Sequence, residues 1–196
     1  AYTVTDKCTG KQLDVENEYV MSTEDLCTIG MLDEILESGA VSLKIEGRGR
    51  APEYVDVVVR CYREAIKAIE QGSYGKEKID AWRKQLETVF HRGLSDGFYR
   101  GKAFKYWSGA ASTKATQEKV FVGEIKNYLV KKGIAEVLVQ ASDLHAGHDC
   151  LITGVTTGVM RLTPKDFYVD EKPATYTKQG DCLTFKVESR VRRGDK

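Results

Sequence analysis

The segment from residue 41 to residue 54 places the strongest constraint on the fold, because it changes character twice within a short stretch. Apolar and polar residues alternate over 41–45, which is typical of a β-strand. Pro52 then occupies a suitable first position for a helix, where its fixed φ angle and missing N–H group are harmless. Between the two lies a loop, 46–50, that contains three charged residues and two glycines.

A strand, a charged loop and a helix in succession predict an α/β protein. In such proteins the loops that follow the strands carry catalytic and binding groups. The residues alone leave a second interpretation open, in which 46–50 is an ordinary turn whose charges are solvated.

The composition indicates a folded protein of one large or two small domains. Hydrophobic residues make up 41% of the 196 residues and charged residues 30%. No apolar run is long enough to predict a transmembrane helix, and the first residues lack the basic start and apolar run of a signal peptide. We therefore expect a cytoplasmic protein with no membrane partner. Because the chain does not begin with Met, we also expect a fragment of a longer protein.

The five cysteines form no recognisable disulfide framework, because their number is odd and no two have C-x-x-C spacing. We therefore expect the cysteines to be reduced thiols, and they do not supply the ligands of a complete zinc site. His145 and His148, followed by Asp149, have a spacing that suits a metal ion, but a turn is the favoured interpretation.

Acidic and basic residues are unevenly distributed along the chain. Residues 1–72 contain 8 Lys and Arg against 14 Asp and Glu, whereas residues 73–140 contain 13 against 7. This asymmetry predicts two units with different surroundings. The basic part suits RNA, whose phosphates would bind its lysines, but it also suits an ordinary solvated face. The lysines that we assign to RNA binding are Lys114, Lys119, Lys126, Lys131 and Lys132.

The first part of the sequence predicts a hairpin, several helices and a single strand. Apolar residues recur at helical spacing in three segments, and a Ser or Thr before two acidic residues predicts a further helix start at 22–25. One strand cannot form a sheet by itself, so missing strands or a second copy of the chain would have to complete it. The expected elements are a hairpin of 2–4 with 13–15, helices 31–38, 52–71 and 76–91, and strand 41–45.

Beyond residue 117 the pattern changes to short apolar stretches separated by glycine turns. Such spacing predicts a small antiparallel β-barrel, and Lys131-Lys132-Gly133 has the composition of a hairpin turn. We therefore divide the chain into 1–72, a helix and linker at 73–116, and a barrel at 117–196. The expected strands are 120–125, 135–139, 147–152 and 180–187.

Residues 20–63 contain polar and glycine positions that resemble peptidase family U32, the collagenase-like proteases. The similar stretches are Val-Met-Ser-Thr-Glu-Asp-Leu-Cys ending at Cys27, Gly-Ala-Val-Ser-Leu-Lys-Ile-Glu-Gly-Arg ending at Arg48, and Glu-Tyr-Val at 53–55 with Tyr-Arg at 62–63. The resemblance implies that residues 1–72 are the last strand and helices of a TIM-like barrel. It also implies that 117–196 is an accessory barrel similar to that of translation elongation factors. The expected fold class is α/β followed by all-β.

The resemblance places Glu46 and Arg48 at the mouth of a barrel strand, where TIM barrels keep their catalytic groups. We expect these two residues to be catalytic. We expect Lys44 and Arg50 to bind substrate, since an arginine can hold a carboxylate or phosphate through two hydrogen bonds. The alternative is that Glu46 and Arg48 pair only with each other or with neighbouring loops.

Some members of the family hold an iron–sulfur cluster through four cysteines, and Cys27 matches one of these ligands. The other matching cysteines are absent. We therefore expect no cofactor in this chain alone and assign a 4Fe–4S cluster only to the full-length protein.

Two functions follow from the resemblance. The first is that the chain is the C-terminal portion of a U32-family peptidase and is inactive by itself. The alternative is an iron–sulfur-dependent, oxygen-independent hydroxylase that modifies tRNA or rRNA, with the β-barrel as an RNA- or protein-binding module. The expected partners are the missing N-terminal barrel segment or a second copy of the chain, with RNA in the second case.

Overall fold

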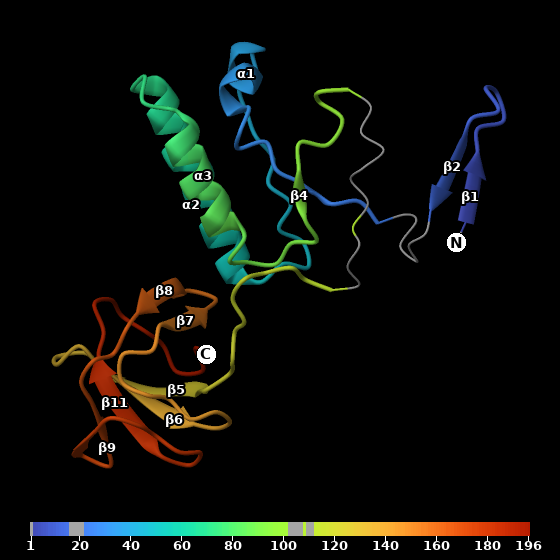
Figure 1. Ribbon diagram of the computed structural model, residues 1–196. Helices are drawn as coiled ribbons and strands as arrows, with labels where there is room; N and C mark the ends of the chain where they lie inside the picture. Colours follow the sequence, from blue (N-terminus) through green and yellow to red (C-terminus); the bar gives the residue numbers. More distant parts are fainter. Residues whose placement is uncertain (1, 16–21, 102–107, 109–111) are drawn as a thin grey trace. The chain divides into compact units, whose positions relative to one another are not determined.

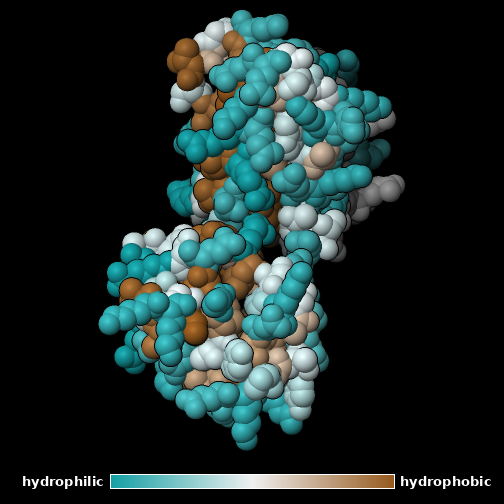
Figure 2. Space-filling model, turned by 90° about the vertical axis from the view of Figure 1, so that its left-hand side faces the viewer, coloured by the Kyte–Doolittle hydropathy of each residue, from teal (hydrophilic) through white to brown (hydrophobic). Residues whose placement is uncertain are grey.

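The computed structural model describes residues 2–15, 22–101, 108 and 112–196, and Figure 1 labels its elements. The chain divides into two compact units, Ala1–Gln117 (unit 1) and Glu118–Lys196 (unit 2). The face that Figure 2 shows is mostly hydrophilic on each unit, with apolar residues in smaller patches. Each unit contains a hydrophobic core of its own.

Unit 1 begins with the expected hairpin, in which β1 (Tyr2–Thr5) and β2 (Gln12–Val15) pair antiparallel. Asp6 stabilises the turn, because its carboxylate accepts the N–H groups of Cys8 and Thr9 at 2.8 and 3.2 Å. These hydrogen bonds favour the charged carboxylate and lower the pKa of Asp6. The predicted hairpin is confirmed.

Three helices supply most of the core of unit 1. They are α1 (Leu32–Glu37), α2 (Pro52–Glu70) and α3 (Lys76–Leu86), and Pro52 begins α2 as predicted. None of the helices that the structure describes is long and apolar enough to span a lipid bilayer. The buried residues of this core are Cys27, Ile29, Leu32, Val57, Val58, Cys61, Ala65, Ala68, Trp82, Leu86 and Val89.

The third helix is shorter than the predicted 76–91. It ends at Leu86, and the N–H groups of Thr88 and Val89 bond to carbonyls three residues back instead of four. The carbonyl of Glu87 accepts the N–H of Thr116 at 2.9 Å. Val89 still packs in the core, so the apolar periodicity continues beyond the end of the helix.

The strand predicted at 41–45 is wrong, since residues 41–47 pair with no strand of the described parts of the chain. Leu43 and Ile45 nevertheless pack against the core of unit 1, while Val41 is fully exposed. An extended segment that lies on a core buries alternate side chains, and it therefore shows the same period as a strand.

The helix start predicted at 22–25 is also wrong. Asp25 and Leu26 form β3 (Asp25–Leu26), which pairs parallel with β4 (Leu94–Ser95). The Asp25 carboxylate does not cap its own segment, because it accepts the N–H of Arg92 at 2.9 Å. The Asp25 carboxylate therefore accepts a hydrogen bond from the loop that contains Arg92 and not from the N-terminus of a helix.

Unit 2 is built from antiparallel strands, as predicted. The described strands are β5 (Gly123–Leu129), β6 (Ile134–Val139), β7 (Cys150–Gly154), β8 (Gly158–Leu162), β9 (Phe167–Val169), β10 (Lys172–Ala174) and β11 (Cys182–Lys186). They form a sheet of order β10-β9-β11-β6-β5 and a separate hairpin of β7 and β8. The turn predicted at 131–133 joins β5 to β6 and is confirmed. Sequence reasoning missed β8, β9 and β10, and the last two are too short to show an alternating pattern.

The last residues of the chain connect these two groups of strands. Ile125 of β5 accepts the N–H of Gly194 and donates its own N–H to the carbonyl of Asp195, while Thr153 of β7 exchanges two backbone hydrogen bonds with Lys196. The described strands do not close a barrel, because β7 and β8 pair only with each other. The structure also does not confirm that residues 1–72 derive from a TIM-like barrel.

Candidate functional site

The charged loop lies between the extended segment and α2. The side chains of Lys44, Glu46 and Arg48 are exposed, and the Glu46 carboxylate accepts the backbone N–H of Arg48 with an Oε1···N distance of 2.7 Å. Gly49 completes the turn with a φ angle of 72°, a value that favours glycine. The contact between Glu46 and Arg48 is thus a side-chain-to-backbone hydrogen bond, and all three side chains are open to solvent.

Arg50 differs from these residues, because its side chain is only 18% exposed and binds Asp25. The Arg50 Nη2 atom lies 3.0 Å from Asp25 Oδ1. The same carboxylate accepts the backbone N–H of Arg92 at 2.9 Å and its Nη2 at 3.5 Å. One carboxylate therefore binds two guanidinium groups, and this cluster carries a net positive charge.

Two aromatic rings also contact the Arg50 guanidinium. Its Cζ atom lies 4.3 Å from the centre of the Phe90 ring and 5.1 Å from that of the Tyr54 ring. Cation–π contacts of this kind add to the ion pair. Burial raises the pKa of Tyr54, although the charge of Arg50 opposes this effect. Intramolecular contacts therefore hold Arg50 as an anchor of the loop.

The pairing of β3 with β4 brings this cluster together. The N–H of Asp25 donates to the carbonyl of Gly93 at 2.8 Å. Gly93 has a φ angle of 113°, and a Cβ atom there would lie 2.5 Å from Oε1 of Glu24. Sequence reasoning missed Asp25, Phe90 and Arg92, because Asp25 and Arg92 are 67 positions apart and share no motif.

Cys27 lies beside this cluster in the core and is 5% exposed. Burial raises the pKa of its thiol, and burial also raises the pKa of the neighbouring Tyr62 to about 12. In the described ranges, no group of three or more His, Cys, Asp or Glu side chains is placed to hold a metal ion. A 4Fe–4S cluster takes four cysteine thiolates, so these residues do not fit such a cluster by themselves.

His145 and His148 form a turn, the interpretation that the sequence favoured. The N–H of His148 donates to the carbonyl of His145 at 3.2 Å. The centres of the two imidazole rings are 5.3 Å apart, and the His145 ring also stacks on the ring of Tyr176.

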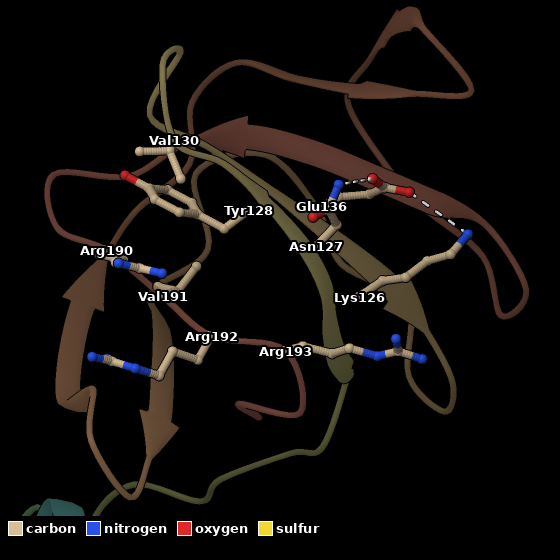
Figure 3. A pocket seen from close by; sticks show the side chains of 9 residues that line it. All are labelled: Lys126, Asn127, Tyr128, Val130, Glu136, Arg190, Val191, Arg192 and Arg193. Carbon is tan, nitrogen blue, oxygen red and sulfur yellow. Dashed lines mark hydrogen bonds and ion pairs between the residues drawn. The ribbon is translucent and has the colours of Figure 1, made fainter.

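The five lysines assigned to RNA binding belong to both units and to different segments of the chain. Lys114 belongs to unit 1, whereas Lys131 and Lys132 are exposed in the turn between β5 and β6. Lys126 lines a cavity of about 550 Å³ in unit 2. Three arginines that sequence reasoning did not select, Arg190, Arg192 and Arg193, line the same cavity (Figure 3). The signal available in the sequence was their close spacing near the end of the chain.

Comparison with known proteins identifies the family. Residues 1–109 match the model of peptidase family U32. The collagenase of Porphyromonas gingivalis strain W83 is 40% identical over 100% of this chain and 47% of its own length. The tRNA hydroxylation protein P of Haemophilus influenzae is 30% identical over 65% of this chain and 27% of its own length.

A solved structure, the C-terminal domain of a protein named as a U32 peptidase from Geobacillus thermoleovorans, aligns with a TM-score of 0.38 and 15% identity. This alignment covers 39% of the present chain and 95% of that domain. The chain spans about half the length of the collagenases that it matches. The chain belongs to peptidase family U32.

Proposed function

We propose that the full-length protein is a peptidase of the collagenase type and that this chain is its C-terminal portion, inactive by itself. The observation that carries the proposal is the 40% identity to a protein named collagenase over 100% of the present chain. Because the chain covers only 47% of that relative, the proposal assigns the activity to the full-length protein.

Within this proposal, the loop at 44–50 supplies part of the active site. The exposed Glu46 carboxylate is held in place by the Arg48 N–H and keeps lone pairs that can accept a proton from water. The exposed guanidinium of Arg48 and ammonium of Lys44 can bind carbonyl or carboxylate oxygens of a substrate. Arg50 contributes by fixing the loop through Asp25.

Hydrolysis of gelatin by the purified full-length protein tests this proposal. We expect the unmodified protein to release peptides and the chain of 196 residues to release none. Glu46→Gln should lower the rate by about 100-fold or more, the usual effect of removing a catalytic proton acceptor. Arg48→Ala should raise KM, and Arg63→Ala, an exposed position on α2, is the matched control.

The outcomes separate the two parts of the proposal. Full activity in both the Glu46 and the Arg48 variants would show that the site lies elsewhere in the protein. Absence of gelatin hydrolysis by the unmodified full-length protein would reject the peptidase function itself.

A second candidate function is hydroxylation of RNA, which the 30% identity to a tRNA hydroxylation protein supports. In this case Cys27 would supply one thiolate of a 4Fe–4S cluster, and the remaining ligands would come from outside the described residues. Mass spectrometry of tRNA nucleosides from a deletion strain should show loss of a hydroxylated base. A visible absorption band in the anaerobically purified full-length protein should weaken in Cys27→Ala.

We also propose that β3 and β4 continue into a larger sheet in the full-length protein. Parallel sheets are normally buried and contain more than two strands, yet β3 and β4 pair only with each other in the described parts. Further strands of the same protein, or a second copy of this chain, would complete the sheet. Sedimentation of the isolated chain distinguishes a monomer from a dimer.

A further inference from the structure

The cavity of unit 2 combines basic side chains with an aromatic ring. Its volume is about 550 Å³. β5 contributes Lys126, Asn127 and Tyr128 to its lining, and the segment near the end of the chain contributes Arg190, Arg192 and Arg193 (Figure 3). All of these residues lie within one unit.

The charge of the cavity is strongly positive. Four of its lining residues are basic and one, Glu136, is acidic. Glu136 is already engaged, because its carboxylate lies 3.6 Å from Lys126 Nζ and accepts the thiol of Cys182 at 3.2 Å. In the parts of the chain that the structure describes, the guanidinium groups of the three arginines make no hydrogen bond and no ion pair. Their donors are therefore available to a ligand.

The backbone that carries these arginines is fixed on both sides. Val191 is 1% exposed and belongs to the core of unit 2. The buried Asp195 carboxylate accepts the N–H of Arg192 at 2.8 Å, and Gly194 donates its N–H to Ile125 at 2.9 Å. A ligand therefore meets arginines on an ordered segment, and binding requires ordering of the side chains alone.

We infer that this cavity binds single-stranded nucleic acid. Arg190, Arg192 and Arg193 hold successive backbone phosphates, since a guanidinium group matches a phosphate through two parallel hydrogen bonds. Tyr128 is half-buried and packs against the core, so its ring offers a fixed surface on which a base can stack. An aromatic ring beside cationic groups favours nucleic acid over an acidic peptide. The inference does not depend on the peptidase proposal, because no residue of the loop at 44–50 takes part.

Fluorescence anisotropy of a labelled single-stranded RNA of about 15 nucleotides, a length at the upper end of common site sizes, tests the inference on the whole chain. Replacement of the three arginines with alanine should weaken binding about 10-fold or more at low salt. It should also reduce the slope of the logarithm of the binding constant against the logarithm of the salt concentration by about two. Tyr128→Leu should weaken binding about five-fold, as loss of one stacked base does, and Tyr128→Phe should bind normally. Circular dichroism confirms that each variant folds.

The matched control removes the same charge elsewhere in unit 2. Lys165, Lys172 and Lys186 are exposed and lie outside the lining of the cavity, so their triple alanine variant should bind RNA within about two-fold of the unmodified chain, as expected for charges without a phosphate contact. Equal losses in the two triple variants would overturn the inference, because net charge alone would then explain binding. Normal binding by the arginine variant, or equally strong competition by poly-glutamate, would overturn it as well.

Discussion

The carboxylate of Asp25 and the guanidinium of Arg50 form an ion pair of 3.0 Å between β3 and the end of the charged loop. Both side chains are 18% exposed, so the pair is more sheltered from water than a surface salt bridge. It joins the two parts of the sequence that carry the family resemblance. Arg50 thereby fixes the end of a loop whose other charged residues, Glu46 and Arg48, remain exposed.

Asp25→Asn should destabilise unit 1, because it removes the charge that two arginines share. We expect a loss of about 1–3 kcal/mol in the free energy of unfolding, the usual range when a sheltered charged hydrogen bond is broken. Urea unfolding followed by tryptophan fluorescence measures it, since Trp82 is buried in the core of unit 1. Arg50→Lys should be nearly as destabilising, because lysine lacks the planar group that stacks on aromatic rings.

Arg63→Ala is the control for both substitutions. Its side chain is exposed on α2, so the change should stay within about 0.5 kcal/mol. An equal loss in Arg63→Ala and Asp25→Asn would contradict the structural role of the Asp25 cluster.

Gly93→Ala should destabilise unit 1 through crowding as well as backbone strain. A Cβ atom at this position would lie 2.5 Å from Glu24 Oε1, whereas Gly72, which also has a positive φ angle, has open space around it. Gly72→Ala should cost about 1–2 kcal/mol from the left-handed backbone alone, and Gly93→Ala should cost more. Urea midpoints of the two variants give the difference.

The combination Glu24→Ala with Gly93→Ala separates the two causes. Removal of the Glu24 side chain should recover the part of the loss that is due to crowding. If the double variant is no more stable than Gly93→Ala, contact with Glu24 is not the reason for the loss.

Unit 1 should lose stability as the pH rises from about 9 to about 11. Burial raises the pKa of the Cys61 thiol from 9.0 to about 11, so in this range the unfolded chain releases a proton that the folded chain retains. Linkage then lowers the free energy of unfolding by up to about 1.4 kcal/mol per pH unit for this group. Below pH 9 both states are protonated and the contribution is constant. Burial raises the pKa of Cys27 and Tyr62 as well, which adds to the effect with the same sign.

Urea unfolding of Cys61→Ala over the same pH range checks this prediction. The variant should be less stable at every pH, because Cys61 is fully buried, but its stability should depend less steeply on pH. Cys8→Ala, at an exposed position, should keep the original slope. An unchanged slope in Cys61→Ala would contradict the prediction.

Asp195→Ala should loosen unit 2, since the buried carboxylate accepts hydrogen bonds from the N–H of Arg192 and the hydroxyl of Thr157. We expect a loss of about 1–3 kcal/mol, as for other buried polar groups left without a partner. Hydrogen exchange at Ile125 and Thr153, whose N–H groups donate to the last two residues, should become faster.

Glu188→Ala, at an exposed position, is the control for this substitution and should leave exchange unchanged. Gly154→Ala offers a second test, because a Cβ atom there would overlap Asp195 Oδ1. That variant should be destabilised in the unmodified chain and much less so when Asp195 is also alanine.

Local patterns in the sequence predicted many of the elements correctly. Pro52 and the apolar spacing after it predicted α2, because helix starts and amphipathic faces depend on residues within a few turns of one another. The same reasoning failed at 41–45, where alternation arises from packing on a core and not from strand pairing.

The sequence by itself determined the family, the hairpin at the start, α2 and the antiparallel character of unit 2, since these depend on neighbouring residues or on a motif. Only the tertiary structure decided that Asp25 binds Arg50 and Arg92, and that Arg190, Arg192 and Arg193 join Lys126 around one cavity. These groupings combine residues far apart in the chain. Their geometry follows from which distant strands and loops pack together, and that choice of partner leaves no periodic signal in the sequence.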